Sequence, residues 1–263
     1  MGIELLAFLS VGVIAGILAG MFGIGGGVII VPALIATFMY LGFDENIITH
    51  LAIGTSLSCI LFTGIASTYS HNKKQGIIWQ AFYPLSVGIF FGATLGAVIA
   101  NNISGVTLRS IVGIFLLFLA IQLLLSNKMK SSNRNSNNTL SIFAGFGIGT
   151  ASSIVGIGGG SFSVPYLRLF GYDMKLCIGT SAACGVPIAL FGSLGYFVAG
   201  LNSSELPEMS AGYIYLPAVF GIAITSMFSA NIGVKITHSL SDKTLKILFS
   251  LFLILGALYM LTI

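Results

Sequence analysis

Apolar residues run through this chain in long, nearly unbroken stretches, and polar residues gather in short breaks between them. The stretches 78–100, 107–126 and 213–233 each reach about 20 residues, the length that an α-helix needs to cross a bilayer. A membrane β-barrel would instead show polar and apolar residues alternating in short strands. The pattern therefore predicts an all-α polytopic membrane protein.

The apolar stretches form two sets. The first set lies at 3–22, 28–42, 47–70, 78–100 and 107–126. The second set lies at 141–155, 160–171, 176–199, 213–233 and 247–263. Because 28–42 and 160–171 are short for a full crossing, we expect about eight to ten helical segments in total.

Sequence motifs repeat between the two sets. The spacing G-I-G-G-G-x-x-x-V-P occurs at 23–32 and again at 156–165, and I-G-T-S occurs at 53–56 and at 178–181. We expect two homologous halves, each with a glycine-rich break. Their predicted bounds are 1–126 for the first membrane repeat, 127–139 for a polar cytoplasmic linker, and 140–263 for the second membrane repeat.

Loop charges indicate that the halves have opposite orientations. Loop 71–77 carries two lysines, whereas its counterpart 200–212 carries two glutamates and no basic residue. The Asp44-Glu45 loop is acidic, whereas Arg168 and Lys175 flank its counterpart. Since Lys and Arg favour the cytoplasmic side, corresponding loops are expected on opposite faces. This predicts inverted repeats with an odd number of crossings in each half. The alternative is two parallel halves whose loop charges carry no topological meaning.

Composition supports the membrane assignment. Hydrophobic residues make up 56% of the chain and charged residues only 7%, against about 25% charged in soluble domains. The basic residues that give the net charge of +4 form no cluster with interleaved aromatic residues, so a nucleic-acid partner is not expected. The first residues lack a basic region and contain Glu4, so they predict the first membrane helix and not a cleaved signal peptide. The three cysteines lie in apolar stretches, and neither a disulfide framework, a metal nor a cofactor is predicted.

The glycine motifs are candidates for an anion site. Glycines inside a helix each cost about 1 kcal/mol relative to alanine, and they leave backbone amides uncovered. Pro32 and Pro165 follow at a distance that suits the first turn of a new helix. Amides at a helix N-terminus attract anions, and paired Gly/Pro interruptions are typical of transporter binding sites. The alternative is that these glycines only allow helices to pack closely.

Hydroxyl groups and cations complete the candidate site. The two G-T-S segments are expected to donate hydrogen bonds to substrate oxygens, or else to bond to carbonyls of their own helices. Ser161 adds a hydroxyl beside the second glycine motif, where the first motif has Val28. The predicted substrate-binding residues are Gly25, Gly26, Gly27, Thr55, Ser56, Gly158, Gly159, Gly160, Ser161, Thr180 and Ser181. His50, Lys175 and Arg168 are expected either to attract the anion or couple protons, or to anchor their helices at the interface.

Acidic residues are confined to loops and segment ends. All seven lie there, so the predicted spans contain no carboxylate of the kind on which many proton and sodium pathways depend. A path for an anion fits this distribution, and an intramembrane hydrolase does not, so no enzyme is expected. The alternatives to a secondary transporter are a passive anion channel and a membrane scaffold that transports nothing.

Both glycine motifs, both I-G-T-S copies and the central linker resemble the TauE/SafE family of sulfite exporters, over residues from about 8 to 260. The resemblance implies a multi-pass permease of the cytoplasmic membrane that exports small sulfur-containing anions such as sulfite or sulfonates. These motifs are specific to the family and not to one substrate. The implied partners are a small anion and membrane lipid, and the sequence leaves the oligomeric state, the coupling ion and the direction of transport open.

Overall fold

A computed structural model describes residues 2–23, 25–125, 137–201, 203, 206–237 and 242–262. The described residues form ten α-helices and no strand. The first half contains α1 (Gly2–Phe22), α2 (Gly27–Tyr40), α3 (Glu45–Lys73), α4 (Trp79–Asn101) and α5 (Gly105–Leu125). The second half contains α6 (Asn138–Val155), α7 (Gly160–Leu169), α8 (Met174–Gly200), α9 (Leu216–Thr237) and α10 (Asp242–Thr262).

The all-α polytopic prediction is confirmed. Within the described residues, seven helices are long and apolar enough to cross a membrane: α1, α3, α4, α5, α6, α8 and α9. The helix count of ten lies at the upper end of the predicted range. The segments after the two glycine motifs are short, as expected, with 14 residues in α2 and 10 in α7. Most of the predicted linker, together with Glu205, lies outside the described residues.

Helices pair between the halves and not only within them. The first helix of each half packs against the fourth helix of the other, α1 with α9 and α6 with α4. The third helices, α3 and α8, pack on each other at the centre, and the fifth helices, α5 and α10, also pair. Helix α3 is the most enclosed, since 89% of its apolar stretch is buried. Each half therefore completes the core of the other.

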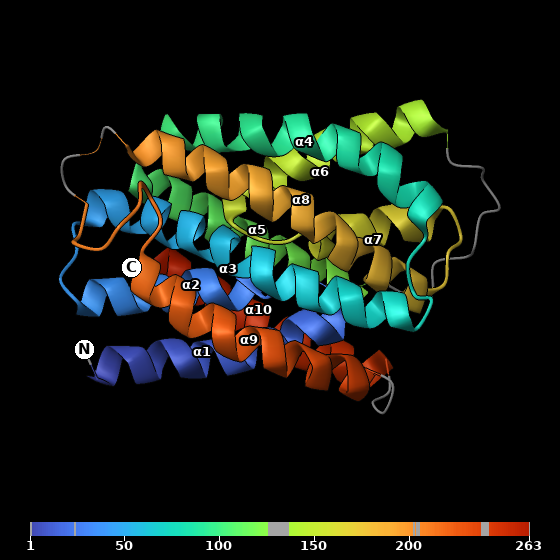
Figure 1. Ribbon diagram of the computed structural model, residues 1–263, viewed down its shortest axis with the longest axis horizontal. Helices are drawn as coiled ribbons and strands as arrows, with labels where there is room; N and C mark the ends of the chain where they lie inside the picture. Colours follow the sequence, from blue (N-terminus) through green and yellow to red (C-terminus); the bar gives the residue numbers. More distant parts are fainter. Residues whose placement is uncertain are drawn as a thin grey trace.

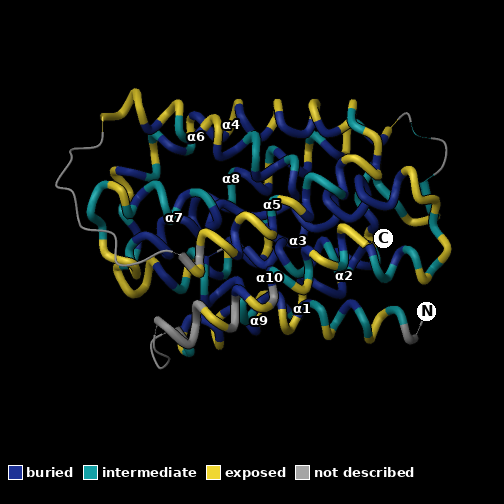
Figure 2. The backbone as a smooth tube through the Cα atoms, turned by 180° about the vertical axis from the view of Figure 1, so that it is seen from behind, coloured by how far each residue is buried: buried dark blue, intermediate teal, exposed yellow. Residues whose placement is uncertain are grey.

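Corresponding helices run in opposite directions (Figure 1). The N-terminal helix α1 begins at the left of the view and α6 begins at the right; the same reversal relates α3 to α8 and α4 to α9. Figure 2 shows the same arrangement from behind, with both chain termini at one end. Opposite directions of corresponding helices are what an inverted repeat requires. The orientation of the molecule in a membrane stays a prediction.

The two ends of the helix bundle differ in charge. The end at which α1 and α3 begin carries the carboxylates of Glu4, Asp44, Glu45 and Glu208. The opposite end carries the cations of Lys73, Lys74, Arg168, Lys175 and Lys235. Among the described residues, Asp173 and Asp242 at the basic end and the buried Arg109 at the acidic end are exceptions. The corresponding loops that were predicted to lie on opposite faces of the membrane thus lie at opposite ends of the molecule.

Glycines set the closest helix crossings. A Cβ atom at Gly16 of α1 would overlap Ser229 of α9, and one at Gly92 of α4 would overlap the carbonyl oxygen of Phe146 in α6. Both glycines belong to runs with four-residue spacing, which allow helix backbones to approach each other in membranes. These glycines serve packing, and they are not those of the two glycine motifs.

The separation of charge between the two ends of the helix bundle predicts on which side of the membrane each end lies. Because Lys and Arg favour the cytoplasmic side, the basic end should face the cytoplasm. In whole cells, a membrane-impermeant thiol reagent should label Glu208→Cys from outside, and should reach Lys74→Cys only after permeabilisation. Both positions are exposed, whereas the three native cysteines are buried. Labelling of both positions from the same side would contradict the predicted topology.

Candidate functional site

Both glycine motifs interrupt the helices as predicted, but with different backbone shapes. In the first break, Gly23, Gly25 and Gly26 have φ values of 68°, 75° and 83°, a left-handed region that favours glycine. In the second break Gly156 has φ 75°, whereas Gly159 has a helical φ of −59°. The prolines lie deeper than predicted, since each is the sixth residue of its helix and not part of the first turn.

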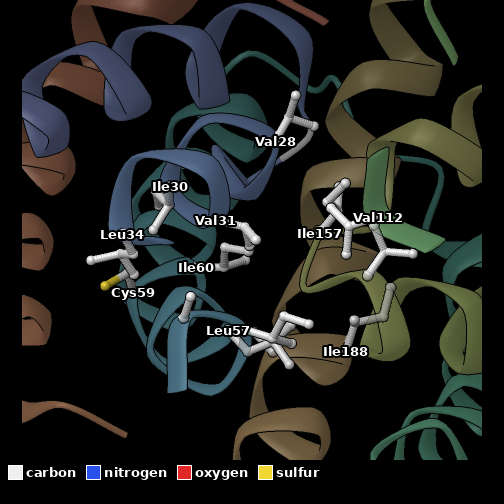
Figure 3. Close-up of a cluster of buried hydrophobic side chains, with 14 of the residues drawn as sticks. Val28, Ile30, Val31, Leu34, Leu57, Cys59, Ile60, Val112, Ile157 and Ile188 are labelled. Atoms are coloured by element: carbon white, nitrogen blue, oxygen red, sulfur yellow. The ribbon is translucent and has the colours of Figure 1, made fainter. Parts of the chain in front are cut away.

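The two breaks touch each other inside the molecule. A Cβ atom on Gly25 would lie 3.5 Å from the Cα atom of Gly158. One on Gly27 would lie 2.9 Å from the Cα atom of Ile157 and would overlap the carbonyl oxygen of Gly156. The predicted glycines of both motifs are buried. Figure 3 shows the buried apolar cluster that includes Val28, next to the first motif glycines in sequence, and Ile157 of the second motif. The structure thus brings together two motifs that are 133 residues apart in the sequence.

The first G-T-S segment, Gly54-Thr55-Ser56 in α3, is bound to the second half along its whole length. Gly54 lies against the carbonyl oxygen of Tyr213, where a Cβ atom would overlap it. The Oγ1 atom of Thr55 accepts a hydrogen bond of 2.9 Å from the N–H of Tyr215. The hydroxyl of Ser56 donates one of 2.9 Å to the carbonyl oxygen of Gly156, in the opposite glycine break.

The second G-T-S segment, Gly179-Thr180-Ser181 in α8, makes the same three contacts with the first half. Gly179 lies against the carbonyl oxygen of Gly76. Thr180 accepts a hydrogen bond of 2.8 Å from the N–H of Ile78, and donates its own hydroxyl hydrogen to a carbonyl one turn earlier in α8. Ser181 donates across 3.3 Å to the carbonyl oxygen of Gly23. We call the two sets of contacts the α3 clamp and the α8 clamp.

The clamps change the interpretation of the hydroxyls. In this conformation Thr55, Ser56, Thr180 and Ser181 hold backbone groups of the opposite half, and only Thr180 also bonds within its own helix. The partners of Thr180 and Thr55, in the segments before α4 and α9, were not predicted from the sequence. Those segments carry no motif, and only the fold places them against α8 and α3.

Aromatic packing fixes the segment that the α3 clamp holds. The ring of Tyr215 lies edge-on to Phe8, Phe38 and Phe43, with centroid distances of 6.2, 5.5 and 5.4 Å. Burial, and secondarily the Glu4 carboxylate, raises the pKa of Tyr215, so its hydroxyl stays protonated. Thr55 therefore binds a segment that packing already holds in place.

The predicted cations do not gather at the breaks. His50 is buried near the start of α3, where its Nε2 atom lies 3.0 Å from the carbonyl oxygen of Ala100. Arg168 donates a hydrogen bond of 3.0 Å to the carbonyl oxygen of Tyr172, just beyond α7. Lys175 is exposed near the start of α8, at the basic end. His50 and Lys175 therefore lie towards opposite ends of the molecule, and the role of each cation as an anion attractor or a helix anchor stays a prediction.

Buried hydroxyls without hydrogen-bond partners flank the second break. Other hydroxyls in the helices, such as those of Thr37, Thr63, Ser86, Thr94 and Thr150, bond to a carbonyl one turn earlier. The hydroxyl oxygens of Ser152, Ser153, Ser161 and Ser163 make no such bond, although Ser163 lies beside the weakly hydrogen-bonding thiol of Cys184.

The first break has no counterpart to these hydroxyls. The corresponding positions are Ala19, Gly20, Val28 and Ile30. Ser152 and Ser153 were not among the predicted site residues. The available signal in the sequence was that the second repeat has serines at these positions and the first repeat does not.

Comparison with known proteins gives one family and several relatives. The family model described as sulfite exporter TauE/SafE matches residues 8–260. A probable membrane transporter protein of Haemophilus influenzae is 39% identical, over 97% of each chain. Another of Methanocaldococcus jannaschii is 31% identical, over 95% of this chain and 93% of its own. The probable membrane transporter protein YunE of Bacillus subtilis is 26% identical, over 93% and 92%. No solved structure matches the chain.

The clamps predict that two glycines cannot be replaced even by alanine. In Gly54→Ala and Gly179→Ala the new methyl group would meet a backbone oxygen, and overpacking of this kind costs roughly 1–3 kcal/mol. Both variants should lose thermal stability in detergent. Gly185→Ala in the same helix as Gly179 is the control, because its Cβ would lie 3.7 Å from the nearest heavy atom. If Gly54→Ala and Gly179→Ala were as stable as Gly185→Ala, the close contacts would be wrong.

Proposed function

Because the chain belongs to the sulfite exporter TauE/SafE family, we propose that it is a secondary transporter that exports small sulfur-containing oxoanions, such as sulfite or sulfonates, across the cytoplasmic membrane. Family membership and the named relatives make it a membrane transporter, and they imply a role other than catalysis. The substrate, the direction and the particular membrane are the proposal. The observation that carries it is the meeting of the two glycine breaks in the buried centre.

The joined breaks offer donors suited to an anion. The first backbone bonds of α7 run from Phe162 and Ser163 to the carbonyl oxygen of Gly159, so the N–H groups of Gly160 and Ser161 have no acceptor within the helix. The N-terminus of α2 at Gly27 has the same arrangement and touches the second break. Two helix N-termini with their positive dipole ends therefore meet, a recurrent feature of anion sites in transporters. We place the substrate at Gly25–Gly27, Gly158–Gly160 and Ser161.

The unpartnered serines indicate that the second break supplies more of the hydrogen bonds. A buried hydroxyl without a partner costs free energy, and such groups call for a ligand or a functional explanation. An oxoanion has several acceptor oxygens and can use both the amides and the hydroxyls of Ser161 and Ser163. The first break, with Val28 and Ile30 at these positions, contributes backbone amides alone.

The two clamps suggest how access alternates. Thr55 holds the segment before α9, which comes from the acidic end, and Thr180 holds the segment before α4, which comes from the basic end. We propose that rocking of the halves opens one clamp at a time, so that the site faces one side of the membrane and then the other. Opening would also free the Thr and Ser hydroxyls of that clamp for the substrate. Any proton coupling would use a histidine or protonation of the substrate itself, because the carboxylates of the described residues lie at the ends of the bundle.

Purified protein in liposomes tests the transport proposal. We expect uptake of labelled sulfite and of small sulfonates that saturates with concentration and is driven by counter-flow of the same anion. Sulfate and acetate in parallel assays, each with and without a pH gradient, define selectivity and coupling. Conductance without counter-flow would indicate a channel, and the absence of flux for every anion would contradict transport of this class.

Matched variants test the site within the same assay. Gly26→Leu and Gly159→Leu should abolish flux, whereas Gly147→Leu should not, because Gly147 faces open space. Ser161→Ala with Ser163→Ala should reduce the apparent affinity about tenfold or more, as expected for lost hydrogen bonds to a charged ligand. Ser86→Ala is the control, since its hydroxyl is bonded within its own helix. Unchanged flux in folded Gly26→Leu and Gly159→Leu would place the substrate elsewhere.

A further inference from the structure

A hollow of about 340 Å³ lies between three helices near the basic end of the molecule. Its wall includes Thr68, Tyr69 and Asn72 from the end of α3, Trp79 and Phe82 from the start of α4, and Val186 from α8. In Figure 1 these parts of α3 and α4 lie beside the loop that joins them, at the end opposite the chain termini. The hollow is separate from the glycine breaks, and the transport mechanism makes no use of it.

The lining is apolar inside and polar at the rim. Phe82, Val186 and Pro187, all half-buried, supply hydrocarbon, and the exposed Ile65 adds to it, while the hydroxyl oxygen of Thr68 is buried without a hydrogen-bond partner. Such a lining suits a hydrocarbon chain and would not hold a free inorganic anion, which needs its charge solvated or hydrogen-bonded.

The rim provides groups that suit a phosphate. The ammonium group of Lys73 lies 4.4 Å from the centroid of the Tyr69 ring, so a cation stands over a residue that lines the hollow. Asn72 and Trp79 are exposed at the same rim, and both carry N–H donors. Exposed Trp and Tyr side chains mark the depth at which membrane helices meet lipid headgroups.

Charge around the hollow favours an anionic occupant. Lys74 follows Lys73, and Lys175 and Lys235 lie at the same end of the bundle. Asp173, at the N-cap of α8, and Asp242, the first residue of α10, are acids at this end, and neither is among the described residues that line the hollow. Basic pockets between membrane helices bind anionic lipid headgroups, and each nearby cation contributes about 1 kcal/mol.

We propose that this hollow binds one anionic phospholipid. Its phosphate is held by Lys73, with the amide of Asn72 and the indole N–H of Trp79 as further donors, and the upper part of one acyl chain fills the space against Phe82 and Val186. Trp79 directly follows Ile78, whose N–H bonds to Thr180. The lipid therefore lies against the segment held by the α8 clamp, where it stabilises the closed position of that segment.

Lipid binding to the purified full-length protein tests the proposal. Delipidated protein is titrated with phosphatidylglycerol or with phosphatidylcholine of the same acyl chains, and bound lipid is counted by native mass spectrometry while Tm is recorded. We expect one retained phosphatidylglycerol and a higher Tm, with little retention of phosphatidylcholine. Equal retention of both lipids, or of neither, would overturn the proposal.

Variants separate a specific site from general attraction to the basic end. Lys73→Gln should weaken phosphatidylglycerol binding about fivefold, the effect of one headgroup cation. Lys235→Gln removes an exposed cation at the same end from α9, a helix that does not line the hollow, and should leave binding unchanged. Val186→Phe narrows the hollow without altering charge and should also reduce retention. Equal effects of Lys73→Gln and Lys235→Gln would show that net charge alone attracts the lipid.

Discussion

Backbone groups outside helices have no water to bond with at the centre of a membrane protein, and the whole architecture depends on how they are satisfied. The two breaks expose carbonyl oxygens at Gly23 and Gly156, and each receives a serine hydroxyl from the third helix of the opposite half. The threonine beside each serine accepts an N–H from the segment before the partner's fourth helix. Neither half can therefore satisfy its own break, which explains why the third helices meet at the centre.

The same constraint leads from fold to function. Non-helical backbone in this setting must lie buried or line a polar cavity, and here two such segments touch. Helix N-termini at both breaks supply amides, and serines without partners add hydroxyls on one side only. The proposed site therefore has a helix N-terminus from each half, whereas its backbone shape and its side chains differ between the two breaks. The clamps beside the breaks also bind the segments before α9 and α4, so in the proposed mechanism substrate binding and access share the same residues.

Much of this organisation is predictable from the sequence, because it depends on periodicity and on exact repetition. Apolar runs of spanning length gave the helices, and the repeated glycine motifs gave the position of both breaks. The partners of Thr55 and Thr180 were not predictable, since they are backbone amides in segments without a motif. The different backbone conformations of Gly26 and Gly159 were not predictable either, because the same motif adopts different φ angles in different surroundings. His50 was expected either to attract the anion or couple protons, or to anchor its helix, and it lies near the start of α3 beside the carbonyl oxygen of Ala100.

Two distances measured in the same preparation test the central claim most directly. Spin labels at Asn46 and Met209 would report on the end held by the α3 clamp, and labels at Lys74 and Met174 on the end held by the α8 clamp, since all four positions are exposed. During sulfite binding and counter-flow in liposomes, the two distances should change in opposite senses, with one pair long only when the other is short. Distances that stay fixed while sulfite crosses the membrane, or that lengthen together, would contradict clamps that open alternately.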